Sequence, residues 1–206
     1  MTTKVYIARL SMYPANKLEA EYEKIRERFV SVGLRKIAQR DENLLGRLML
    51  DKAMQSLSAG AYTVEYSGND KPVLINGKGL YFNISHSGDY VALALSDEEV
   101  GCDIQEIRPY SPRVAKRNYC EKETEFIENS LDKDESFIRL WALKESVLKF
   151  DGSGIAGGLS NYDFSPYAGE DEFTAFGCNF YVEKIGNTYF ALCHKNPQFE
   201  IETMYV

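Results

Sequence analysis

Helix-like and strand-like segments follow one another twice along the 206-residue chain. Charged sequence with helical apolar spacing, residues 18–57, precedes strand-like sequence at 63–104. Two further helix-like segments, 113–129 and 137–150, precede a β-rich tail at 173–204. Runs of helices and runs of strands that stay separate along a chain are typical of α+β folds. The order of segments therefore predicts an α+β protein.

A faint repeat accompanies this order. The segment His86-Ser87-Gly88-Asp89 has turn chemistry and lies between strand-like residues 80–84 and 90–95, which predicts a hairpin. The sequence Tyr90-Val91-Ala92-Leu93 follows Gly88-Asp89, and Tyr189-Phe190-Ala191-Leu192 follows Gly186-Asn187-Thr188 about half a chain later. Duplication of an α+β half and chance likeness between aromatic hairpins both explain the repeat.

Charge and cysteine content exclude several classes of protein. The formal net charge of −7 disfavours binding to bulk nucleic acid or to anionic membranes. The four cysteines form no CxxC pair and only two histidines are present, which disfavours a zinc site. Residues 1–10 lack the apolar core of a signal peptide, and no run approaches the ~20 apolar residues of a membrane span. We therefore expect a reduced, cytoplasmic protein.

The segment Val100-Gly101-Cys102-Asp103-Ile104-Gln105 is a candidate metal-binding strand. Alternation along a strand directs Cys102 and Ile104 to one face and Asp103 and Gln105 to the other, about 7 Å apart along the chain. Two oxygen donors at this spacing suit Mg²⁺, which prefers oxygen ligands. The alternative is an ordinary half-buried strand with a solvated polar face.

A second candidate is the predicted helix at residues 137–150. Its apolar arc contains Trp141, with Glu145 and Lys149 one turn apart at the edge. Lys144 falls inside the arc, where an ammonium is costly unless it is paired. The alternative is that Lys144 extends outward and that Glu145 and Lys149 form an ordinary surface pair.

A third candidate is Phe82-Asn83-Ile84-Ser85-His86-Ser87-Gly88, at a strand end. Hydroxyls, an imidazole and a glycine in this position can bind phosphate, because glycine lets the backbone approach a ligand. The alternative is an ordinary hairpin turn with a structural histidine.

Together the three segments resemble the 4′-phosphopantetheinyl transferases of the surfactin-synthetase type. Asn83-Ile84-Ser85-His86-Ser87, Gly101-Cys102-Asp103-Ile104-Gln105 and Trp141-Ala142-Leu143-Lys144-Glu145-Ser146-Val147-Leu148-Lys149 are similar to that family's NISHS, G-[IV]-D-[IV]-E and W-xx-K-E-[AS]-xx-K signatures, in the same order. The match is clear from about Lys71 to Gly154 and faint elsewhere.

The resemblance implies a fold and a reaction. The fold would be two similar α/β halves related by a pseudo-twofold axis, residues 1–98 and 99–206, with the active site between them. The reaction would be Mg²⁺-dependent transfer of the 4′-phosphopantetheine group of coenzyme A to a serine of an apo acyl or peptidyl carrier protein. Family members of this size usually act as monomers.

The resemblance also implies roles for individual residues. Expected metal ligands are Asp103, Gln105 and Glu145. Expected catalytic residues are Lys149, which would contact the phosphate under attack, and Glu145 or Glu123, either of which would accept the serine proton. Expected contacts to coenzyme A are Arg40, Lys71 and Lys144, together with Ser85 and His86, which match family positions near its 3′-phosphate. Gln105 departs from the family, which has an acid there, and this substitution predicts weaker Mg²⁺ binding because an amide carries no charge.

The sequence also allows two other functions. Because Gln105 replaces an acid, the chain could bind coenzyme A or a carrier protein without transferring anything. It could also be an unrelated Mg²⁺-dependent enzyme acting on nucleotide phosphates, although no GxxxxGK[ST] phosphate loop is present.

Overall fold

The structure, a computed structural model, describes residues 1–29, 41–66, 71–154 and 158–206. The strands are β1 (Thr3–Arg9), β2 (Thr63–Tyr66), β3 (Pro72–Ile75), β4 (Tyr81–Ser87), β5 (Tyr90–Ser96), β6 (Val100–Glu106), β7 (Glu172–Ala175), β8 (Cys178–Ile185), β9 (Thr188–His194) and β10 (Phe199–Thr203). The helices are α1 (Ala15–Glu23), α2 (Asp41–Ser56), α3 (Pro112–Asn118), α4 (Glu121–Asn129) and α5 (Lys133–Asp151). This mixture confirms the α+β class.

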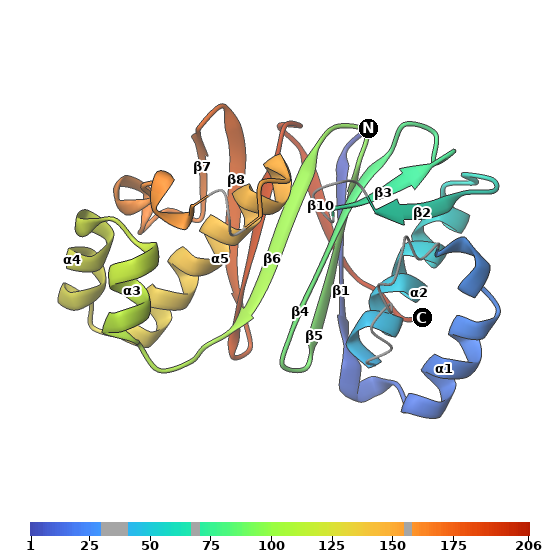
Figure 1. The fold of residues 1–206 in the computed structure, drawn as a ribbon, viewed down its shortest axis with the longest axis horizontal. Helices are drawn as coiled ribbons and strands as arrows, with labels where there is room; N and C mark the ends of the chain where they lie inside the picture. Colours follow the sequence, from blue (N-terminus) through green and yellow to red (C-terminus); the bar gives the residue numbers. More distant parts are fainter. Residues whose placement is uncertain (30–40, 67–70, 155–157) are drawn as a thin grey trace.

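Two four-stranded sheets form the centre of the molecule, with helices at either end (Figure 1). The first sheet has the order β10-β1-β5-β4 and the second has the order β6-β9-β8-β7. Helices α1 and α2 and the small β2-β3 hairpin lie beside the first sheet, and α3, α4 and α5 lie beside the second (Figure 1). In both sheets, the first strand in sequence pairs antiparallel with a later hairpin strand: β1 with β5, and β6 with β9.

The faint sequence repeat falls on equivalent strands of the two sheets. Tyr90 to Leu93 lie in β5 and Tyr189 to Leu192 lie in β9. Each of these strands is central in its sheet and forms a hairpin with the strand before it, β4 or β8. The repeat thus reflects a shared strand arrangement.

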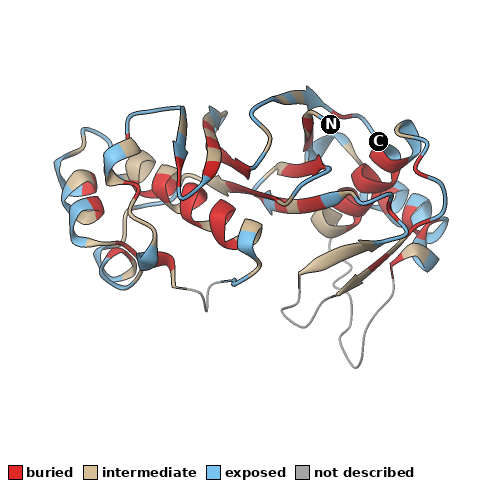
Figure 2. Cartoon of the chain, turned by 90° about the horizontal axis from the view of Figure 1, so that it is seen from above, coloured by how far each residue is buried: buried red, intermediate tan, exposed pale blue. Residues whose placement is uncertain are grey.

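The core consists of three clusters of buried side chains. One packs α1 and α2 on the first sheet, around Leu45 and Leu93, and another packs α3, α4 and α5 on the second, around Leu140 and Phe180. The third cluster joins the sheets and takes residues from β1, β5, β6 and β9. Buried residues accordingly gather in the central strands and on the helix faces turned toward them (Figure 2).

Local structure differs from expectation at two places. Strand β4 continues to Ser87, which pairs with Tyr90, so the turn contains only Gly88 and Asp89. Gly88 has φ +55°, and two-residue hairpins need a positive φ in the turn. The predicted helix at 113–129 is two helices, because the backbone at Tyr119 and Cys120 is extended.

The last strand, β10, belongs to the C-terminal half of the predicted division but lies in the first sheet. β10 pairs in parallel with β1, so residues 199–203 complete the first sheet. The division into 1–98 and 99–206 stays a prediction, and it separates the strands of the two four-stranded sheets except β10. None of the helices in the described part of the chain has both the length and the apolar character of a membrane span.

Candidate active site

A cavity of about 580 Å³ opens between β4, β6 and α5. Its walls contain six of the expected site residues: Ser85, His86, Asp103, Gln105, Glu145 and Lys149. The two carboxylates expected to hold a metal therefore share one concave space, although Asp103 and Glu145 lie on different elements.

Strand β6 presents its side chains as the alternating pattern predicts. Cys102 and Ile104 are fully buried in the cluster that joins the sheets. Asp103 and Gln105 face the cavity. Asp103 is only 1% exposed, and its Oδ2 atom has no hydrogen-bond partner within the described ranges. A buried carboxylate oxygen without a partner is costly, so this atom is poised to accept a ligand.

Helix α5 contributes the other charged groups. Asp132 caps its N-terminus by accepting a hydrogen bond from the Glu135 N–H, and Gly152, with φ +74°, caps its C-terminus. Burial, and then the negative charge of Asp103, raises the pKa of Glu145. Burial alone disfavours the Lys149 ammonium, but surrounding charges, chiefly Asp103, outweigh it and raise the pKa of Lys149. Lys149 Nζ lies 2.5 Å from Asp103 Oδ1.

A close approach of α5 to β6 brings these groups together. A Cβ atom on Gly101 would lie 2.1 Å from the carbonyl oxygen of Ser146 and 2.4 Å from the nitrogen of Phe150. Only glycine fits at this contact, because the atoms it would meet belong to the helix backbone. Gly101 therefore sets the separation between the strand that carries Asp103 and the helix that carries Glu145.

Lys71 lies beside a second, smaller cavity of about 240 Å³, which shares Ile84 and Lys149 with the first. Lys71 Nζ donates to Glu99 Oε2 at 2.7 Å and to the Phe150 carbonyl at 2.8 Å. The lysine expected to contact coenzyme A thus lies next to the candidate site. Arg40, another expected contact, lies outside the described residues.

Glu123 and Lys144 do not line the cavity described above. Both side chains are fully buried, and they pair with each other at 2.8 Å. Glu123 also accepts hydrogen bonds from the backbone N–H groups of Cys120 and Phe164, and Lys144 also donates to the carbonyl of Leu159. The pair joins α4, α5 and the segment around residue 160, so Lys144 is buried and paired rather than extended outward.

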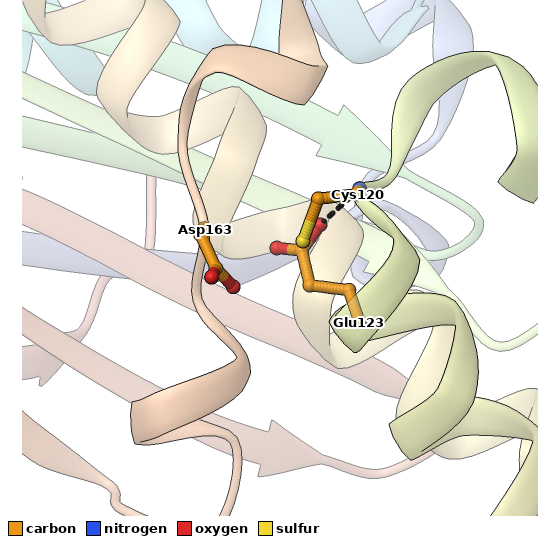
Figure 3. A group of neighbouring side chains, drawn as sticks. All are labelled: Cys120, Glu123 and Asp163. Carbon is orange, nitrogen blue, oxygen red and sulfur yellow. Dashed lines mark hydrogen bonds between the residues drawn. The ribbon is translucent and has the colours of Figure 1, made fainter.

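A second cluster contains three side chains of types that can ligate a metal, namely Cys120, Glu123 and Asp163 (Figure 3). The Lys144 ammonium, however, already lies against the Glu123 carboxylate and supplies the positive charge there. We therefore assign this cluster a structural role.

Lys144→Met or Glu123→Gln alone is expected to lower the free energy of unfolding by about 3–5 kcal/mol, because each leaves a buried charge without its partner. The double variant should cost less than the sum, with a coupling energy of about 2 kcal/mol. Urea unfolding of the four proteins measures this coupling. Strictly additive losses would show that the two groups do not stabilise each other.

Sequence reasoning missed part of the cavity wall. Arg108 and Ser111 follow β6, and Val114 lies on α3, yet all three line the cavity. No motif marked them, because they meet the site only through the path of the chain after β6. Arg108 could have been suspected, since it is a cation close after the candidate metal-binding strand.

Comparison with known proteins shows which family the chain is similar to. A family model described as the 4′-phosphopantetheinyl transferase superfamily matches residues 99–189. The 4′-phosphopantetheinyl transferase psf-1 of Bacillus pumilus is 31% identical over 171 residues, which cover 77% of this chain and 73% of that protein. The chain belongs to the 4′-phosphopantetheinyl transferase superfamily. The resemblance inferred from the three motifs is thereby confirmed.

Other members of the superfamily match shorter stretches. The 4′-phosphopantetheinyl transferase AcpT of Salmonella typhi is 39% identical over 53% of this chain and 57% of its own length. The 4′-phosphopantetheinyl transferase Sfp of Bacillus subtilis is 36% identical over 48% of this chain and 44% of its own length. A solved structure, Thermotoga maritima holo-[acyl-carrier-protein] synthase, aligns with TM-score 0.32 and 19% identity over 48% of this chain and 64% of that chain.

Proposed function

We propose that this protein transfers the 4′-phosphopantetheine group of coenzyme A to a serine hydroxyl of an apo acyl or peptidyl carrier protein, and that the cavity between β4, β6 and α5 is its active site. Membership in the superfamily supports the reaction. The observation that carries the choice of site is that Asp103, Glu145 and Lys149 line one cavity, with a buried Asp103 oxygen lacking a partner among the described residues.

The residues present fit a divalent cation. Asp103 Oδ2 is buried without a partner in the described chain, and the charge of Asp103 raises the pKa of Glu145, after burial itself. A cation between the two carboxylates would relieve that repulsion. Asp103 and Glu145 would hold Mg²⁺, with Gln105 offering a neutral carbonyl oxygen. Mg²⁺, when bound, supplies Lewis-acid stabilisation of the charge that develops on the diphosphate.

The chain's own groups provide positioning and charge, which phosphoryl transfer needs more than covalent chemistry. The serine oxygen forms the new bond to phosphorus while the bond to adenosine 3′,5′-bisphosphate breaks. Lys149 places its ammonium beside the transferred phosphoryl group. Glu145 accepts the serine proton, directly or through a water molecule. Glu123, the other candidate base, has its carboxylate occupied by Lys144 and two backbone N–H groups.

The test is incubation of the protein with coenzyme A, Mg²⁺ and an apo carrier protein, followed by mass spectrometry of the carrier. We expect a gain of one phosphopantetheine that EDTA abolishes. Coenzyme A binding without a mass gain would instead support a non-catalytic binding module. Hydrolysis of coenzyme A without a carrier would support a general phosphate-cleaving enzyme.

Gln105→Glu should lower the Mg²⁺ concentration for half-maximal activity several-fold, because an added carboxylate strengthens binding of a hard cation. Gln105 is half-buried on the cavity wall, so its side chain can reach the same space as Asp103. Mg²⁺ titration of the transfer rate is the measurement, with Gln105→Met as the control that offers no oxygen. An unchanged or raised requirement in Gln105→Glu would place residue 105 away from the metal.

We further propose that the two halves of the chain are related by a pseudo-twofold axis and that the protein acts as a monomer. Matching strand arrangements, β1-β5-β4 and β6-β9-β8, support the axis. Asp103, Glu145 and Ser85 lie in one cavity of one chain, which supports a site that needs no second copy.

A further inference from the structure

Strands β4 and β6 lie side by side at the edges of the two sheets (Figure 1). Alternate side chains of β4 accept hydrogen bonds from backbone N–H groups of β6. The rungs are Cys102 N to Asn83 Oδ1 at 3.2 Å, Ile104 N to Ser85 Oγ at 3.2 Å and Glu106 N to Ser87 Oγ at 3.0 Å. We call these three contacts the β4–β6 ladder.

The ladder supplies hydrogen-bond acceptors for the backbone N–H groups on the open side of the edge strand β6. Buried backbone N–H groups need acceptors, and an edge strand has one side without a backbone neighbour. Side-chain oxygens of β4 accept these hydrogen bonds from β6, so a side chain lies between the two strand backbones at each contact. The ladder therefore joins the halves without merging the sheets.

Ser85 differs from the other two rungs. Its hydroxyl also donates to Asp103 Oδ1 at 2.7 Å and accepts from Lys149 Nζ at 2.9 Å. Lys149 Nζ contacts the same Asp103 oxygen, so Ser85, Asp103 and Lys149 form a closed triangle. Ser85 is 4% exposed and Asp103 is 1% exposed. One carboxylate oxygen, Oδ1, is held by this triangle, and the other, Oδ2, has no partner in the described part of the chain.

The bonding capacity of the Ser85 hydroxyl is fully used. A serine hydroxyl has one proton to donate and two lone pairs to accept. The proton goes to Asp103, and the lone pairs accept from Ile104 N and Lys149 Nζ. No proton remains for a phosphate oxygen, which is a contact that the family resemblance implied for Ser85.

We propose that Ser85 is a positioning residue for the transfer reaction. By holding Asp103 Oδ1 it would leave Oδ2 available to hold a cation, and by accepting from Lys149 it keeps the ammonium beside the same carboxylate. Residues that orient metal ligands through hydrogen bonds commonly affect metal affinity and turnover. This inference rests on the proposed function, because it assigns Ser85 a role in that same site.

The test compares Ser85→Ala with Ser87→Ala. Both variants remove one rung of the ladder, but in the described part of the chain Ser87 forms no hydrogen bond to Asp103 or Lys149. Mn²⁺ is titrated into each protein in the absence of coenzyme A and carrier, and binding is measured by electron paramagnetic resonance. This measurement reports on the metal site without depending on the transfer reaction. We expect Ser85→Ala to weaken Mn²⁺ binding about tenfold and Ser87→Ala to leave it unchanged, with similar losses in unfolding midpoint. Equal weakening in both variants would overturn the proposal.

A second comparison separates positioning from phosphate binding. Transfer is measured with coenzyme A and with 3′-dephospho-coenzyme A as donors. We expect Ser85→Ala to lower kcat about tenfold with both donors and to change KM little. If the defect is in KM and disappears with 3′-dephospho-coenzyme A, Ser85 contacts the 3′-phosphate and the proposal is wrong.

Ser85→Thr provides a variant that keeps the hydroxyl in case Ser85→Ala does not fold. It should bind Mn²⁺ within about threefold of the parent, since threonine suits a strand and preserves all three hydrogen bonds. Ser85→Cys, with a weaker donor, should fall between threonine and alanine; a cysteine variant equal to the parent would contradict the proposal. If the parent protein shows no transfer of phosphopantetheine, the proposed function is refuted. The Mn²⁺ comparison tests the role of Ser85 independently of that result.

Discussion

Glu145→Gln is expected to lower kcat about 100-fold or more, because the variant loses the carboxylate that we propose holds Mg²⁺ and accepts the serine proton. The amide has the shape of the carboxylate but cannot accept the serine proton, and it holds Mg²⁺ more weakly. The measurement is the initial rate of carrier loading at saturating coenzyme A and Mg²⁺. Stability should not fall: burial and Asp103 raise the pKa of Glu145, so the charged form is disfavoured in the folded state and a neutral amide removes that cost.

Glu125→Gln is the matched control for this change. Glu125 is exposed on α4, outside the cavity between β4, β6 and α5, and the substitution alters net charge by the same amount. It should load the carrier at the parental rate. A Glu145→Gln protein that also loads at the parental rate would remove Glu145 from the mechanism.

Gly101→Ala is expected to destabilise the fold by about 4 kcal/mol or more, a size of effect that belongs to severe overpacking. The added Cβ would lie 2.1 Å from the Ser146 carbonyl oxygen, and this atom belongs to the backbone of α5 rather than to a flexible side chain. Either α5 moves away from β6 or the core opens. Any folded fraction should also lose activity, because α5 carries Glu145 and Lys149. The unfolding midpoint in urea measures the first effect.

Gly169→Ala is the control, because a Cβ there meets no atom within 4 Å in the described structure. Its free energy of unfolding should remain within about 0.5 kcal/mol of the parent value, as for other surface substitutions. Equal stability of Gly101→Ala and Gly169→Ala would show that α5 and β6 are not in the close contact described.

Local patterns in the sequence predicted most of the elements. Alternation along residues 100–105 correctly separated the buried Cys102 and Ile104 from Asp103 and Gln105, because successive strand side chains face opposite ways. The helical spacing of 137–149 predicted α5, and both candidate metal carboxylates reached the same cavity. These inferences need only the regular geometry of one strand and one helix.

Contacts between distant segments were harder to predict. The addition of β10 to the first sheet and the burial of Lys144 against Glu123 both depend on partners far along the chain. Lys144 was marked as unusual by its place in an apolar arc, but the arc alone did not reveal the carboxylate that pairs with it. The family resemblance implied a contact between Lys144 and coenzyme A, whereas α5 turns Lys144 toward Glu123 and Glu145 toward the cavity.

By itself, the sequence determined the α+β class and the strand and helix that carry Asp103 and Glu145, because periodicity is a local property. The family followed from the likeness of three motifs, which needs no knowledge of how they pack. Only the tertiary structure decided that Glu123 and Lys144 form a buried pair and that Ser85 links β4 to Asp103 and Lys149. The physical reason is that a hydrogen bond or ion pair acts over a few ångströms in space. Which groups come that close depends on how the two sheets and α5 pack together.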